Sequence, residues 1–294
     1  MLKSVGLGGF YMSLRNKLFI TGGNVVSFLK WKFILKVEEQ IREMEESRKE
    51  TIKRRRQVDG KDLKRSLSEF RYEIAKQLYE AYSSKEDIAI LLTEAKKLID
   101  ESVKALDELG YTKIVDSNFI TLTPLAIGLH NPYTEPLEIS IAWDPYINLP
   151  YIPASSLKGA VASLAWANGS KLYDLLSKKD EASPIVFLDS YPVEVFGKSL
   201  LALDIINPHY REAEGKISEP ESSPTPLRFL VVSKHVAFRV VICIAKRWFT
   251  FHKQKLNLNE LTALVSNAIS RGVGAKTSLG YGRLSQKHFT SADS

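Results

Sequence analysis

The sequence predicts an α+β protein in which a helical segment precedes an antiparallel sheet. Apolar residues recur every three or four positions through residues 36–109, and strand-like alternation takes over after Gly110. From there the predicted elements follow as strand, helix, strands, helix, strand. This order is typical of a ferredoxin-like unit, a four-stranded antiparallel sheet backed by two helices. We therefore expect a helical segment over residues 1–112 and a ferredoxin-like (RRM-like) domain over 113–294.

Three helices are predicted in the first segment. One covers about residues 34–58 and ends in the basic cluster Lys53–Arg56, which fits either a phosphate contact or a solvated helix end. The second carries a regular apolar stripe, with Asp62 as its candidate cap. The third begins at Ser83 or Ser84 and ends at Gly110. The stripe of the second helix consists of Leu63, Leu67, Phe70, Ile74 and Leu78.

The second segment alternates short apolar runs with two amphipathic stretches. Helices are predicted at 155–167 and 258–269. A long loop is expected at 207–226, because Pro, Ser, Glu and Gly dominate there. Strands are predicted at 119–123, 125–127, 185–188 and 200–206, twice within 227–244, and at about 281–289.

Composition indicates a polyanionic partner and excludes several kinds of site. The net charge is +7 and the pI about 9.2. Cys243 is the only cysteine, so neither an intrachain disulfide nor a cysteine-based zinc site can form, which fits a reducing cytoplasm. Glycines and lysines interrupt the apolar stretch 18–35, so we expect no membrane span. The histidines lack metal-ligand spacing, and we expect neither a metal nor a cofactor.

Positive charge is concentrated near the C-terminus. Residues 228–287 contain eleven Lys and Arg and one acid, Glu260. Aromatic residues are interleaved with these cations. Because cations neutralise phosphates and flat rings stack on bases, the segment favours nucleic acid or another acidic partner over a bland surface. The aromatic residues are Phe238, Trp248, Phe249, Phe251, His252 and Tyr281, several of which must also belong to the core.

A glycine-rich loop is predicted at residues 270–283. Its four glycines allow positive φ and bring backbone amides close to an oxygen-rich ligand. A nucleotide-binding P-loop fails on spacing, because Ala275 precedes Lys276, and on order, because a helix precedes the loop. The pattern therefore favours a phosphate-binding loop over a plain turn. Its candidate contacts are Arg271, Gly272, Gly274, Lys276, Thr277, Ser278, Gly280, Tyr281, Gly282 and Arg283.

This loop, GVGAKTSLGYGR, resembles the G-rich loop of the RAMP superfamily of CRISPR proteins. A second RAMP-like motif, YIPASSLKG, covers residues 151–159, with Ala154 where glycine is usual. Ser155 or Ser156 can cap the following helix, and Lys158 lies in its first turn, so its N-terminus offers a phosphate site or an ordinary cap. Asn207–Tyr210 and Pro224–Leu230 narrow the resemblance to the sixth-subunit family of type III-B Cmr effector complexes.

The resemblance covers about residues 118–289 and implies a cytoplasmic RNA-guided interference complex. It implies a non-catalytic subunit that caps a filament of backbone RAMP subunits. Its partners would be the 3′ portion of the guide (CRISPR) RNA, the guide–target RNA duplex and other Cmr subunits. Ser155, Ser156, Lys158, His209 and Tyr210 join the glycine-rich loop as expected RNA contacts.

An enzymatic alternative is a metal-independent endoribonuclease that processes guide RNA. Such a reaction needs a general base and a group that stabilises the developing charge. His209 is the best candidate base, His130 the second, and Lys276 the stabilising group. Metal-dependent cleavage through Asp144 is a further route, although a lone carboxylate binds magnesium poorly and Asp-Pro usually forms a turn.

Overall fold

The computed structural model describes residues 32, 34–39, 42, 60–129, 137, 139–177, 183–206, 211–213, 216–218, 227–252 and 257–286. Of these, the side chains of 60–67, 211–213, 216–218, 251 and 252 are left undescribed. The chain forms two compact units. One comprises Met1–Ala81, His130–Ser140 and Leu203–Leu230, and the other comprises Tyr82–Leu129, Ile141–Ala202 and Val231–Ser294.

The first unit contains the helix α3, Gly60–Ala81. Ile74 and Leu78 are buried, which confirms the predicted apolar stripe. The proposed cap was wrong: α3 begins before Asp62, which lies inside its first turn. Of the predicted helix at 34–58, residues 34–39 and 42 are helical, and the basic cluster lies outside the described residues.

The long loop predicted at 207–226, also in this unit, contains a short hairpin. Strand β7 (Arg211–Ala213) pairs antiparallel with β8 (Lys216–Ser218). The prediction of an entirely irregular loop was therefore wrong, because turn-forming composition is equally compatible with a tight hairpin. Arg228, just beyond the loop, places its guanidinium carbon 4.4 Å from the centre of the Tyr72 ring.

The second unit begins with α4, Lys85–Glu108, whose ends were predicted correctly. Ser84 is the N-cap, and its hydroxyl accepts a hydrogen bond from the Asp87 amide. Gly110, at φ +85°, lets the chain leave the helix in the left-handed conformation that favours glycine. Ile88, Ala95 and Ile99 form its buried face.

A five-stranded antiparallel sheet follows. The strand order is β11-β1-β10-β4. Strand β5 pairs with β10 as well, further along the strand than β4 does. This is the order of a ferredoxin-like sheet whose second strand is divided into β4 and β5, so the predicted fold class is confirmed. The strands are β1 (Tyr111–Thr121), β4 (Ile185–Phe187), β5 (Pro192–Val195), β10 (Val236–Ala245) and β11 (Leu284–Ser285).

Several predicted boundaries in this domain need correction. Strand β1 starts directly after Gly110 and ends at Thr121, and beyond it Leu125 and Ala126 make only isolated bridges. Strand β11 is only two residues long within the described part. The sequence analysis missed β5, α6 (Leu172–Leu176) and α7 (Lys246–His252), and also a small hairpin of β2 (Trp143–Asp144) and β3 (Leu149–Pro150). All four are short, and periodicity is weak over few residues.

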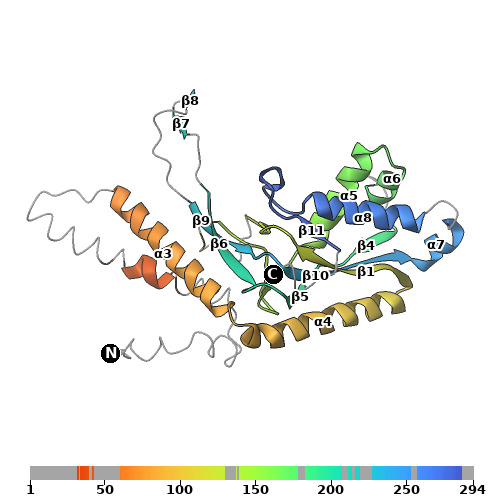
Figure 1. Ribbon diagram of the computed structural model, residues 1–294, viewed down its shortest axis with the longest axis horizontal. Coiled ribbons are helices and arrows are strands. Elements are labelled where there is room, and N and C mark those ends of the chain that lie inside the picture. Colours follow the sequence, from red (N-terminus) through yellow and green to blue (C-terminus); the bar gives the residue numbers. More distant parts are fainter. Residues whose placement is uncertain are drawn as a thin grey trace, which may run out of the picture. The chain divides into compact units, whose positions relative to one another are not determined.

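Helices lie on both sides of the sheet (Figure 1). The helices α5 (Ala154–Ala167) and α8 (Leu258–Arg271) pack together on one side with α6, and α4 lies on the other. Phe119 and Phe238, paired on the central strands, are fully buried. The strand pair β6 (Leu201–Ile206) and β9 (Leu227–Val232) forms a separate small sheet.

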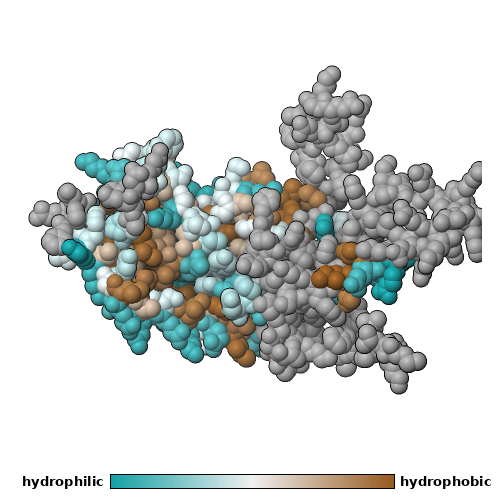
Figure 2. All heavy atoms as spheres, turned by 180° about the vertical axis from the view of Figure 1, so that it is seen from behind, coloured by the Kyte–Doolittle hydropathy of each residue, from teal (hydrophilic) through white to brown (hydrophobic). Residues whose placement is uncertain are grey.

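The surface mixes polar and apolar side chains. Figure 2 shows the side of the molecule behind the view of Figure 1, where apolar groups are separated by charged and polar ones. None of the helices in the described residues combines the length and hydrophobicity that a bilayer span requires.

Candidate nucleic-acid interface

The glycine-rich loop follows α8 and is fixed at both ends to the segment 122–126. The Ala275 amide donates to the Ala126 carbonyl at 2.7 Å, and the Gly282 amide donates to the Pro124 carbonyl at 2.8 Å. Across the loop, the Val273 amide donates to the Gly282 carbonyl at 2.9 Å. Backbone hydrogen bonds thus hold both legs of the loop and leave its tip, 276–281, projecting from the sheet.

The fold itself requires the four glycines. A Cβ on Gly274 would lie 2.5 Å from the Ala126 carbonyl oxygen, and one on Gly282 would lie 2.0 Å from that of Val273. Gly272 adopts φ +131° and Gly280 φ +92°. The number of glycines is therefore explained by close packing and backbone conformation, and is not in itself a sign of a phosphate ligand.

The tip of the loop presents unused backbone amides. Lys276 adopts the left-handed conformation, φ 58° and ψ 28°, and a 3-10 turn follows at Thr277–Leu279. Among the described residues, no acceptor is hydrogen-bonded to the amides of Thr277 and Ser278. A left-handed residue followed by a right-handed turn orients successive N–H groups toward one point, which is the arrangement that binds anions.

Three cations surround this tip. Arg271 and Arg283 are exposed, and Lys276 is half-buried. None of the three forms an ion pair within the part of the chain that the structure describes. The segment 270–283 contains no carboxylate and no imidazole. It therefore offers positive charge and N–H donors, the groups that bind phosphates.

The structure also brings the second motif toward this loop. Ser170, after the end of α5, donates a hydrogen bond of 2.9 Å to Glu260 in the first turn of α8. The two helices are therefore antiparallel, so the start of α5 and the end of α8 lie at the same end of the pair. Ser155, Ser156 and Lys158 thus lie toward the end from which the loop departs.

The predicted capping of α5 was wrong. Pro153 is the N-cap, and Ser155 and Ser156 lie inside the first turn without a capping hydrogen bond. The cap comes from Asp189, whose carboxylate accepts from the Ala154 amide at 2.7 Å. Sequence reasoning missed Asp189 because it is 35 residues away on another element. Its negative charge already offsets part of the positive charge at the N-terminus of α5.

The structure revises the C-terminal charge excess as well. Arg239 forms ion pairs with Asp116 and Asp100, and Lys246 pairs with Asp107 at 2.7 Å. These acids belong to α4 and β1, so counting charges from residue 228 onward could not include them. Fewer of the described cations are left without an ion pair than the charge count suggested. Within the described part of this segment, the cations without an ion pair include those at the loop and the exposed residues Lys234 and Arg247, whereas Lys253, Lys255 and Lys287 lie outside that part.

The interleaved aromatic residues are mainly structural. Phe238 is fully buried in the sheet, and Trp248 and Phe249 are half-buried on α7. Tyr281 is half-buried at the loop. The side chains of Phe251 and His252 lie outside the described ones. The described aromatic side chains therefore offer little free surface for base stacking. Tyr281, at the loop, is the best placed of them.

The catalytic alternatives find little support in the described residues. His209, Tyr210 and His130 lie outside them. Asp144 has both carboxylate oxygens occupied: Oδ1 accepts from the amides of Tyr146 and Ile147, and Oδ2 accepts from the Tyr191 hydroxyl. Among the described residues, no group of three or more His, Cys, Asp or Glu could hold a metal. Cys243 is buried, and burial raises the pKa of its thiol.

Comparison with known families identifies the domain. The profile of the RAMP superfamily matches residues 118–285, a range that includes most of the sheet, the helices α5 and α8 and the glycine-rich loop. The chain belongs to the RAMP superfamily. Its glycine-rich loop is therefore the RAMP loop that the sequence resembled, and the predicted family is confirmed.

Two curated RAMP relatives carry the same subunit name. The chain is 29% identical over 224 residues to the CRISPR system CMR subunit Cmr6 of Saccharolobus solfataricus, covering 75% of this chain and 72% of that protein. It is 37% identical over 125 residues to Cmr6 of Pyrococcus furiosus, covering 39% and 34%. The second similarity therefore concerns only part of each chain. The expected resemblance to the sixth Cmr subunit is confirmed.

A solved structure supports the same relationship. A chain in the cryo-EM structure of the type III-B Cmr-beta complex bound to cognate target RNA matches with a TM-score of 0.63 and 26% identity. The match covers 79% of this chain and 76% of that one. The similarity therefore extends beyond the RAMP domain match.

Proposed function

We propose that this RAMP protein is a non-catalytic RNA-binding subunit of a type III-B CRISPR effector complex. It caps the filament of backbone RAMP subunits and contacts the 3′ region of the guide RNA and the guide–target duplex. Its partners are guide RNA, target RNA and other Cmr subunits, and it acts in the cytoplasm. The similarity to Cmr6 proteins and to a chain in an RNA-bound Cmr complex supports this assignment.

The observation that carries the RNA-binding role is the loop tip. The amides of Thr277 and Ser278 and the cation of Lys276, which have no partner among the described residues, could bind one anionic group together. Arg271 and Arg283 extend the positive surface on either side. Backbone amides and cations bind phosphates regardless of base, so they suit a subunit that must accept any guide sequence.

The start of α5 is the second proposed contact. Ser155 and Ser156 supply hydroxyl donors, and Lys158 supplies a cation on the first turns. Because Asp189 caps this helix, we propose that the side chains contribute here and that the helix end itself contributes little. His209 and Tyr210 stay in the proposed interface on the strength of the sequence resemblance.

The decisive experiment is affinity purification of the complex, assembled with the full-length chain, followed by quantification of the guide RNA that copurifies. RNA affinity is then titrated at several salt concentrations. The Lys276→Ala/Arg283→Ala double variant should bind more weakly, and its slope of log K against log salt concentration should be shallower by about 0.7–0.9 per lost phosphate contact. Lys97→Ala/Lys104→Ala removes the same charge from exposed positions on α4 and should bind as the wild type does. Equal salt dependence in both double variants would refute the loop contact.

The endoribonuclease alternative makes a separate prediction. If the chain processed guide RNA without a metal, the purified complex would cut a guide precursor in EDTA, and His209→Ala would abolish the cut. We expect no cleavage by the complex, whether it carries the wild-type chain or His209→Ala, because phosphate binding alone accounts for the proposed role. EDTA-resistant cutting that depends on His209 would replace the binding assignment with a catalytic one.

A further inference from the structure

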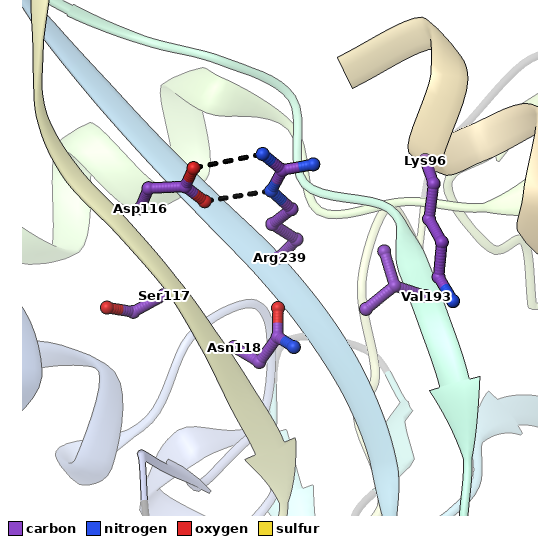
Figure 3. A pocket seen from close by; sticks show the side chains of 6 residues that line it. All are labelled: Lys96, Asp116, Ser117, Asn118, Val193 and Arg239. Atoms are coloured by element: carbon purple, nitrogen blue, oxygen red, sulfur yellow. Dashed lines mark hydrogen bonds and ion pairs between the residues drawn. The ribbon is translucent and has the colours of Figure 1, made fainter. Parts of the chain in front are cut away.

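A cavity of about 400 Å³ lies on the side of the sheet that faces α4, away from α5 and α8. Figure 3 shows it between the two central strands and the helix. Asn118 of β1 and Arg239 of β10 are direct partners in the strand register, so their side chains emerge on the same face. The cavity is lined by Lys96, Asp116, Ser117, Asn118, Val193 and Arg239.

Arg239 is fixed in this cavity by two carboxylates. Its Nε and Nη2 donate to Asp116 at 2.8 and 2.9 Å, and its Nη1 donates to Asp100 at 2.7 Å. A guanidinium has five N–H groups, so two are left for another acceptor. The planar group is thus positioned before any ligand binds, and ligand binding need not order it.

Two further polar groups at the cavity are unused. Lys96 of α4 is exposed and reaches down toward Val193 (Figure 3). Neither the Lys96 ammonium nor the side-chain carboxamide of Asn118 has a hydrogen bond or an ion pair within the described residues. An ammonium, a carboxamide and a fixed guanidinium therefore line the same cavity. With Lys113 included, the cations here outnumber Asp100 and Asp116 by one.

A second cavity, of about 350 Å³, continues along α4. It shares Lys96 and Val193 with the first, and its wall adds one cation, Lys85, and one carboxylate, Glu194. Helix α4 and strand β5 form its two sides. The two cavities together make a groove with a lysine in each part. A groove of this kind suits a chain of linked anionic units better than a single small anion.

We propose that this groove, the α4–sheet groove, is a second nucleic-acid site that binds single-stranded RNA, with one nucleotide seated in the larger cavity. The carboxamide of Asn118, an exposed side chain, offers both a donor and an acceptor to a base edge. Lys96 and the free N–H groups of Arg239 bind the phosphate. The site lies outside the glycine-rich loop, and it rests on the proposed RNA-binding function only in the choice of ligand.

The test is a fluorescence-anisotropy titration of the full chain with a labelled 12-nucleotide polyuridine RNA. Lys96→Ala and Asn118→Ala should each weaken binding about fivefold or more, and Asn118→Asp more strongly, because it places a carboxylate beside the phosphate. Lys97→Ala, the neighbouring exposed lysine on α4, should stay within about twofold of the wild type. All three positions carry exposed side chains, so the four variants should fold normally.

The outcomes distinguish a free nucleotide from RNA as the ligand, and they test the groove separately from the glycine-rich loop. Uridine monophosphate that displaces the RNA at millimolar concentration, with the same loss in Lys96→Ala, would confirm the groove and identify a free nucleotide as its ligand. If Lys96→Ala and Asn118→Ala bind the RNA as tightly as Lys97→Ala does, the groove proposal is refuted. Lys276→Ala/Arg283→Ala tests the loop independently, so either proposal can fail while the other stands.

Discussion

The Arg239 guanidinium lies side-on to the Asp116 carboxylate, with Nε–Oδ1 and Nη2–Oδ2 distances of 2.8 and 2.9 Å. This paired hydrogen bond joins the two central strands, β10 and β1, on the face toward α4. Charge-assisted pairs of this geometry are directional as well as strong. Arg239 therefore stabilises the pairing of the two strands and, in our proposal, also binds the phosphate in the groove above them.

Acid should weaken this pair. The hydrogen bond from Arg239, aided by Lys113, holds the pKa of Asp116 below its ordinary value. Because the folded pKa is lower than the unfolded one, the stabilisation is complete above about pH 5 and is lost as the pH falls through the folded pKa. Urea denaturation of the wild type and Asp116→Asn at several pH values should show a difference of about 1–2 kcal/mol at pH 7 that shrinks in acid.

Asp100 provides the control for that prediction. It binds the same guanidinium, but its side chain is 63% exposed, compared with 22% for Asp116. Solvent screening should limit the effect of Asp100→Asn to about 0.5 kcal/mol. An equal loss in both variants would show that the pairing geometry of Asp116 contributes nothing special.

Two glycines of the loop should differ sharply in their tolerance of a methyl group. Gly280→Ala places a Cβ in open space and incurs only the cost of positive φ, about 1–2 kcal/mol. Gly282→Ala places a Cβ 2.0 Å from the Val273 carbonyl oxygen and must displace the loop backbone. Thermal denaturation should give a clearly lower Tm for Gly282→Ala. Similar Tm values for the two variants would mean that the loop backbone moves at little cost to accommodate the added methyl group.

Asp144→Ala should affect stability and not cleavage. The substitution removes the acceptor for the amides of Tyr146 and Ile147 and for the Tyr191 hydroxyl. We expect a loss of about 2 kcal/mol, because several polar groups lose their partner together. Asp144→Asn keeps an acceptor and should lose less. Loss of a magnesium-dependent RNA cut in Asp144→Ala, at unchanged stability, would instead assign the residue a catalytic role.

Asp189 separates helix capping from RNA contact. Asp189→Ala removes the acceptor of the Ala154 amide and should cost about 1 kcal/mol, whereas Asp189→Asn should largely keep the cap. If Ser155, Ser156 and Lys158 contact phosphates, Asp189→Asn should also tighten RNA binding, because a like charge is removed. Asp174→Asn on α6 controls for net charge. Unchanged RNA affinity in Asp189→Asn would count against the contact at α5.

The sequence by itself determined the fold class, the family and the glycine-rich loop. These properties are encoded locally: the 3.6-residue stripe of α3 and α4, the strand alternation and the spacing of Gly272 to Arg283 can each be read within a short window. Ser84 and Gly110 were likewise recognisable, because caps depend on residues close in sequence.

Only the tertiary structure decided which charges are free and which residue caps α5. Asp116 neutralises Arg239 from 123 positions away, and Asp189 caps Ala154 from 35 positions away. No local pattern reveals such partners, because strand register and helix packing bring them together. The same packing brought Lys96 and Asn118 to one cavity and created the α4–sheet groove, a feature that exists in the folded chain alone.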